Sequence, residues 1–152
     1  MMYVGITHEH YQDTVYWFTV EESLAQHVKL YSRVICDTRR GNHDGTVTYI
    51  LEGIPEEMAK SIIGERFFPL RQVISVYKDA DLEDIFIPWD VETTAPDVGE
   101  IARSITHYYV NGKFQAPVKL TPDMALCDGY TDYLAAKMFD HNTLNCVIVP
   151  WR

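Results

Sequence analysis

The sequence has few of the features that mark secreted, membrane-spanning or disulfide-rich proteins. Three of its 152 residues are cysteine, they form no C-x-x-C pair, and an odd number cannot close a disulfide framework. No apolar run reaches the roughly 18 residues of a membrane-spanning helix. The opening residues MMYVGITHEH lack the charged and apolar regions of a signal peptide. We therefore expect a soluble, cytoplasmic protein with reduced, mostly buried thiols.

Basic side chains are missing from one continuous stretch. Residues 79–100, DADLEDIFIPWDVETTAPDVGE, hold eight Asp or Glu and no Lys or Arg, and they carry nearly all of the net charge of -9. Duplex binding needs clustered Lys and Arg, so this stretch would repel nucleic acid. It is either a solvated connector or an acidic surface for a basic macromolecular partner. Asp79, Asp81, Glu83 and Asp84 are the candidate contacts of such a partner.

The first half of the chain has the pattern of a small antiparallel β domain. Apolar or aromatic runs separated by turn residues predict strands at 3–7, 14–20, 33–37, 45–51 and 71–77. A short helix is expected between Pro55, which suits a first helical position, and Gly64, which can end it. Five strands with one helix before the last resemble an SH3-like barrel over residues 1–78.

Several polar and aromatic residues of this half are candidates for binding. The turn residues of TRRGNHDG predict a hairpin loop with Arg39 and Arg40 near its base or tip. Alternation along VYWFTV sends at least one aromatic away from the core, which makes Trp17 a candidate contact for a partner. His8 and His10 share a strand face, but no third ligand is fixed nearby, so no metal site is expected.

The second half alternates helical and strand patterns. Asp97 and Glu100 form an acidic capping box before a helix that ends at Asn111-Gly112. An apolar stripe that includes Val98 and Tyr109 is expected to face the core, which leaves Tyr108 exposed. Strands are expected at 85–91, 116–120, 124–127 and 143–150, with a second helix at 130–139. The predicted order is strand, helix, strand, strand, helix, strand.

The segments IFIPWDV, EIARSI, FQAPVKL, ALCDGYTDYLAAKMF and LNCVIV, in this order, resemble the ParB/sulfiredoxin-like domain over about residues 83–150. The resemblance rests on the element order, the strand with Pro117, and the spacing from Gly129 to Ala135-Ala136. It implies an α+β protein in which the barrel of residues 1–78 leads into a ParB-like domain at 97–152. Residues 79–96 are then an acidic connector with the first strand of that domain.

In that family the turn before the second helix holds nucleotide phosphates with backbone amides and arginines. Thr131 and Asp132 stand where the ParB branch typically has its two arginines, and Asp128 adds a second carboxylate. Cys127 lies two residues before Gly129, so the catalytic Gly-Cys-His-Arg of sulfiredoxins is not matched either. We interpret the turn as structural, without a cofactor or catalytic residue. The alternatives are a metal-assisted site at Asp128 and Asp132 and phosphate binding by the backbone amides of the turn alone.

Three functional classes follow from these observations. The favoured hypothesis is a non-enzymatic binding or regulatory protein, of a kind found in phages and mobile elements. Its acidic and aromatic surfaces would engage a partner such as a nucleic-acid enzyme, as an inhibitor or DNA mimic. The alternatives are DNA binding through the ParB-like half and the Arg39-Arg40 hairpin, and a nucleotide-dependent hydrolase or nuclease. An exposed edge strand could also pair two copies into a homodimer.

Overall fold

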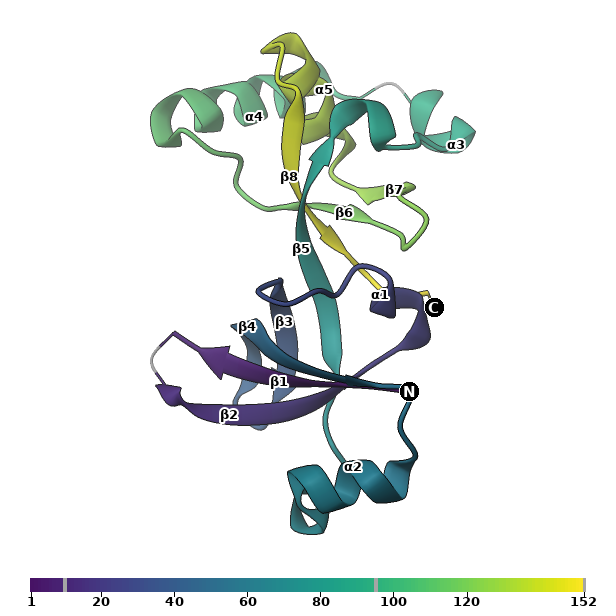
Figure 1. Cartoon of the computed structure of the whole chain (residues 1–152). Helices are drawn as coiled ribbons and strands as arrows, with labels where there is room; N and C mark the ends of the chain where they lie inside the picture. Colours follow the sequence, from purple (N-terminus) through teal and green to yellow (C-terminus); the bar gives the residue numbers. More distant parts are fainter. Residues whose placement is uncertain (10, 95, 152) are drawn as a thin grey trace. The chain divides into compact units, whose positions relative to one another are not determined.

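The chain has a mixed α+β fold, as predicted (Figure 1). The computed structural model describes residues 1–9, 11–94 and 96–151, so His10 of the predicted histidine pair lies outside the described residues. The chain forms two compact units. The first comprises Met1–Tyr77 together with the C-terminal residues from Val149, and the second comprises Lys78–Ile148. In sequence, the second unit is therefore an insertion between two parts of the first.

Antiparallel strands in the order β2-β1-β4-β3-β5 build the first unit. Its elements are β1 (Met2–His8), β2 (Tyr11–Val20), α1 (Glu22–Ala25), β3 (Arg33–Thr38), β4 (Gly41–Glu52), α2 (Glu56–Ile63), the 3-10 helix η1 (Glu65–Phe67) and β5 (Val73–Asp81), which continues from Lys78 into the second unit. All five strands expected from the apolar runs are present, and each is longer than predicted. The strand pattern therefore predicted the number and the order of the strands in this half of the chain.

The sheet is open, so the structure does not show the separate SH3-like barrel that the sequence predicted. Strand β5 pairs with β3 through Val73 to Val76, and in the strand order it is also the neighbour of β8. The sheet consequently continues beyond β5 instead of returning to β2. A single isolated bridge, between Thr19 and Gln72, links β2 to the segment just before β5.

The hairpin between β3 and β4 is tighter than the predicted loop. Thr38 pairs with Gly41, so Arg39 and Arg40 alone form the exposed turn. The Thr38 hydroxyl donates to the Gly41 carbonyl oxygen at 2.6 Å and accepts the Arg40 N–H at 3.2 Å. Gly41 has a φ of 97°, which favours glycine at this position. The residues after Gly41, which were expected in the loop, belong to strand β4.

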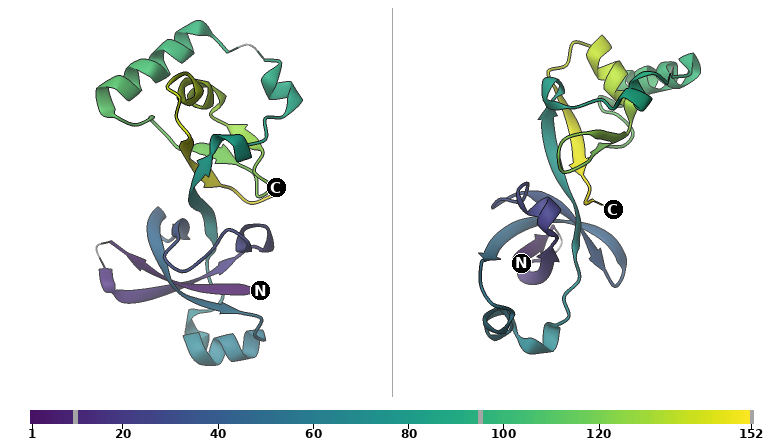
Figure 2. Two further views of the ribbon diagram at one scale, coloured as in Figure 1. Left: turned by 45° about the horizontal axis from the view of Figure 1, so that its top comes forward. Right: turned by 90° about the vertical axis from the view of Figure 1, so that its right-hand side faces the viewer.

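Helix α2 covers one part of the first unit's core. It ends at Gly64 with a φ of 115°, as predicted, and begins after Pro55, which is the N-cap residue instead of the first helical residue. Ala59 and Ile63 of this helix pack with Tyr3 of β1 in a buried cluster. The strands of the unit curve strongly, with α2 at one end of them (Figure 2).

The second unit contains the remaining elements. They are η2 (Leu82–Asp84), α3 (Trp89–Glu92), α4 (Val98–Asn111), β6 (Val118–Leu120), β7 (Leu126–Asp128), α5 (Tyr130–Met138) and β8 (Thr143–Ile148). Strand β6 pairs with β8 in parallel and with β7 antiparallel. Helix α4 packs on α5 (Figure 1). The helix ends at Asn111 and Gly112 follows in the left-handed conformation, as the sequence indicated.

The strand predicted at IFIPWDV is not formed. Phe86 makes an isolated parallel bridge with Ala125, and the chain then enters the short helix α3 after Pro88. Proline has no N–H to donate to a neighbouring strand, and its fixed φ suits the start of a helix. The bridge therefore stops after one residue.

The packed face of α4 also differs from the prediction. Tyr109 is 76% exposed, whereas Tyr108 is half-buried, and no side chain of this fully described helix is buried. Tyr108 lies within 5.0 Å of the rings of Phe114, Phe139 and His141, measured between centroids. Its hydroxyl also reaches the His141 ring nitrogen Nε2 at 3.1 Å. A polar partner and three rings thus favour Tyr108 over Tyr109 on the inner side.

Candidate functional site

All eight carboxylates of residues 79–100 are exposed, and they form no ion pair with any other described residue. The three ion pairs found within residues 1–9, 11–94 and 96–151 all lie in the first unit. The negative charge of residues 79–100 is therefore available to a partner.

Part of this charge lines a groove of about 710 Å³ between η2 and the C-terminal end of α5. The lining residues are Asp81, Leu82, Glu83, Asp84, Tyr133, Lys137, Asp140, His141 and Asn142. The Leu82 N–H donates to the Asn142 carbonyl oxygen at 2.9 Å, which fixes one wall against the other. Lys137 is the one lysine or arginine among the nine lining residues, against four carboxylates. The groove is thus suited to cations.

Aromatic packing behind the groove holds its α5 side in place. His141 lines the groove and is bonded to Tyr108 of α4, as described above. The Lys137 ammonium lies 5.5 Å from the centroid of the Tyr133 ring. These contacts order the side chains on this wall before any partner binds.

The structure brings together three of the four predicted acidic contacts. Asp81, Glu83 and Asp84 line the groove, and Asp79 is exposed on β5. Sequence reasoning missed Asp140, which joins them from the far end of α5. Its position after an Ala-rich helix gave no signal, because the groove forms only when two segments about 55 residues apart in sequence are paired by the fold.

The other predicted partner contacts lie in the first unit. Arg39 and Arg40 form the exposed tip of the β3–β4 hairpin. Trp17 is half-buried, stacks on Tyr49 with centroids 6.1 Å apart, and packs against the α2 cluster. Its neighbour Tyr16 is 44% exposed.

The turn at Asp128-Gly129 has a packing reason for its glycine. Gly129 has a φ of 100°, and a Cβ atom there would lie 2.9 Å from Cγ2 of Val118. Asp128 is exposed, while Thr131 and Asp132 are half-buried on the first turn of α5. Within the described ranges, no three His, Cys, Asp or Glu side chains converge as metal ligands would.

The cysteines differ in exposure. Cys36 and Cys146 are buried and Cys127 is exposed. Burial raises the pKa of the Cys36 and Cys146 thiols to about 12. A nucleophilic cysteine needs its thiolate form, so neither buried thiol is suited to that chemistry.

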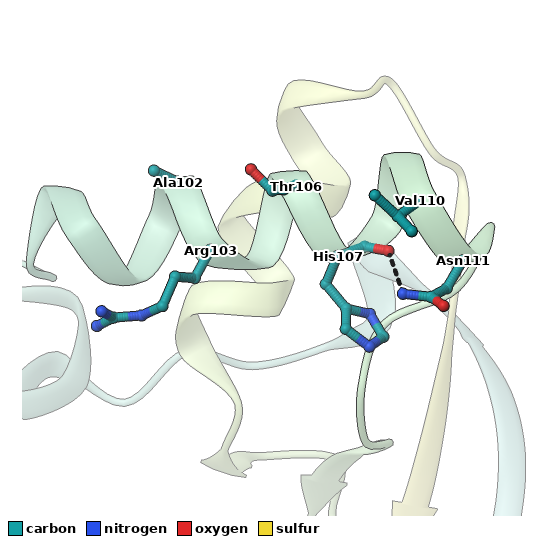
Figure 3. Close-up of a pocket in the computed structure, with 6 residues that line it drawn as sticks. All are labelled: Ala102, Arg103, Thr106, His107, Val110 and Asn111. Atoms are coloured by element: carbon teal, nitrogen blue, oxygen red, sulfur yellow. Dashed lines mark hydrogen bonds between the residues drawn. The ribbon is translucent and has the colours of Figure 1, made fainter.

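A second, shallower depression of about 430 Å³ lies along α4 (Figure 3). It is lined by Ala102, Arg103, Thr106, His107, Val110 and Asn111. The Asn111 side-chain amide donates to the His107 carbonyl oxygen at 3.0 Å. All lining residues belong to one helix, so the depression has a single wall and cannot surround a ligand.

Comparison with solved structures finds partial matches, each over about half of the chain. No protein-family model and no curated protein matches the sequence. A Pnob8-like ParB-N domain is 13% identical with a TM-score of 0.45, and the match covers 51% of this chain and 31% of that one. Sulfiredoxin from Arabidopsis thaliana is 18% identical with a TM-score of 0.44, and the match covers 49% of this chain and 85% of that one. The chain thus spans about a third of the ParB-N structure.

No helix in the part of the chain that the structure describes has both the length and the apolarity of a membrane span, and the longest, α4, has 14 residues.

Proposed function

We propose that the protein is a non-enzymatic binding protein that engages a basic macromolecular partner through the acidic groove. The observation that carries the proposal is the convergence of Asp81, Glu83, Asp84 and Asp140 on one groove. They come from two separate segments of the chain, and none of them is in an ion pair with another described residue.

The electrostatics of the groove support this function. Four carboxylates near one another repel, which costs folding free energy that a single Lys137 offsets only in part. Cationic side chains of a partner would relieve this repulsion and would be steered to the groove by its field. An enzyme that acts on nucleic acid has a basic surface of this kind. In such a complex the carboxylates would take the places of phosphates, as in a DNA mimic or inhibitor.

The test compares two variants with the same change of charge. The groove variant carries Asp81→Asn, Glu83→Gln and Asp84→Asn. The control variant carries Asp13→Asn, Glu21→Gln and Glu52→Gln, which are exposed residues of the first unit. Binding of a lysine-rich peptide is measured by calorimetry, with circular dichroism as the check of folding.

We expect the groove variant to bind the peptide about ten-fold more weakly than wild type, because three nearby charges are lost. The control variant should bind within about two-fold of wild type, because its charges lie outside the groove. Affinity should also fall as salt is raised. Equal weakening by the two variants would mean that net charge, and not the groove, governs binding.

A further inference from the structure

Two large aromatic side chains that closely follow the acidic groove residues in sequence are exposed. Phe86 is 64% exposed and Trp89 is 77% exposed, and both lie in the segment FIPWDVE of residues 86–92. Neither ring makes an aromatic or cation–π contact with another described residue. Exposed aromatics on an ordered surface are typical anchors of protein–protein interfaces.

The backbone that carries these rings is fixed by hydrogen bonds. The Phe86 N–H donates to the Met124 carbonyl oxygen, and the Leu126 N–H donates to the Phe86 carbonyl oxygen, both at 2.9 Å. The Trp89 carbonyl oxygen accepts the Thr93 N–H at 3.0 Å and the Thr93 hydroxyl at 2.9 Å. Because its backbone is already ordered, this segment loses little conformational entropy when a partner covers the two rings.

The charges around the rings select the chemistry of the partner. Glu83 and Asp84 precede the segment, and Asp90 and Glu92 lie within it. No lysine or arginine occurs between residues 79 and 100. Nucleic acid, an anionic membrane and a second copy of this acidic segment would all be repelled. The fitting occupant is a cation that also favours contact with an aromatic face.

We infer that Trp89 is the stacking platform for an arginine side chain of the basic partner, with the neighbouring carboxylates as its hydrogen-bond acceptors. This inference rests on the proposed function and adds the identity of the side chain that is recognised. A guanidinium is planar, weakly hydrated, stacks on aromatic rings and bonds a carboxylate with two parallel N–H groups. The ammonium of lysine is a strongly hydrated point charge, so it pairs with the carboxylates but does not stack on the ring as a planar group does.

The test uses the full chain and two peptides of equal length and spacing, one with arginine and one with lysine at every basic position. Wild type should bind the arginine peptide about five-fold more tightly than the lysine peptide. Trp89→Ala should remove this preference while its affinity for the lysine peptide stays within about two-fold of wild type. Trp89→Phe should keep part of the preference, because a smaller aromatic face remains. Trp151→Ala, at another exposed tryptophan, should keep all of it.

The outcomes separate this inference from the proposed function. If wild type binds both peptides equally and Trp89→Ala changes neither affinity, the groove proposal stands and the arginine platform is wrong. A preference for arginine that survives in Trp89→Ala also overturns the inference. If wild type binds neither peptide, both proposals fail. Because Trp89 is mostly exposed, its replacement should leave the circular dichroism spectrum unchanged.

Discussion

The hydroxyl oxygen of Tyr77 lies 3.1 and 3.3 Å from the two carboxylate oxygens of Asp44, two strands away in the sheet. Arg33, on the strand between them, donates to the same carboxylate at 3.1 Å, and its guanidinium lies over the Tyr77 ring at 5.1 Å. Three adjacent strands are thus linked through one carboxylate. Burial and then the charge of Asp44 raise the pKa of the Tyr77 hydroxyl.

Tyr77→Phe should lower the free energy of unfolding by up to about 1 kcal/mol, because it removes one donor from a half-exposed carboxylate. The measurement is urea denaturation at neutral pH. Tyr31→Phe, at a side chain that is 76% exposed, is the control and should change little.

The same tyrosine predicts a pH dependence. In the unfolded chain Tyr77 ionises near the ordinary pKa of 10.0, and in the folded chain it ionises at higher pH. The unfolded state therefore releases its proton first, and stability should fall as the pH rises above 10.0. Tyr77→Phe should show a shallower fall than wild type, and parallel curves would contradict this assignment.

The exposure of the cysteines predicts selective alkylation. With a pKa of about 12, Cys36 and Cys146 hold very little thiolate at pH 8 and are covered by the fold. Iodoacetamide should modify Cys127 in the native protein and all three cysteines in urea, as read by mass spectrometry. Native Cys127→Ser should remain unmodified, and rapid labelling of either buried thiol would contradict the burial described here.

Gly129→Ala should cost about 2 kcal/mol or more of unfolding free energy, because the positive φ strains the new side chain and Val118 crowds it. Gly53→Ala is a matched control. Gly53 has a φ of 73°, and no described atom lies within 4 Å of a Cβ placed there. The loss of unfolding free energy in this variant should therefore come from the backbone conformation alone and be about 1 kcal/mol. Equal losses in the two variants would mean that the Val118 side chain moves away from the new methyl group without loss of stability.

The face of α4 that packs inward can be tested with its two neighbouring tyrosines. Tyr108→Ala should destabilise the protein by about 1.5 kcal/mol, because it removes a half-buried ring and the bond to His141. Tyr109→Ala should change stability by about 0.5 kcal/mol or less, since that ring is mostly exposed. Urea denaturation measures the loss of unfolding free energy in each variant. A larger loss for Tyr109→Ala than for Tyr108→Ala would mean that Tyr109 faces inward, as predicted from the sequence.

Local signals in the sequence predicted where two of the helices end. Gly64 and Gly112 each follow a helix with a positive φ, and only glycine adopts such a conformation without strain. The apolar runs likewise located all five strands of the first unit. These features depend on residues close in sequence, which is why they could be predicted.

Features that depend on distant residues could not be predicted in the same way. Periodicity identified an apolar stripe on α4, but Tyr108 and not Tyr109 bonds His141, which comes from another part of the chain. Curvature and pairing beyond β5 decided that the sheet stays open. The groove needed Asp140 beside residues 81–84, and no local pattern places it there.

Helix α4 has fourteen residues and not one fully buried side chain, so it makes few buried apolar contacts with the rest of the second unit. A helix of this length gains little stability from its backbone hydrogen bonds alone. The free energy needed to open α4 should therefore be far smaller than the free energy needed to open strands β6 and β8, whose paired residues are buried except for Lys119. In amide hydrogen exchange, α4 would behave as its own cooperative segment, which exchanges by local opening while strands β6 and β8 stay protected.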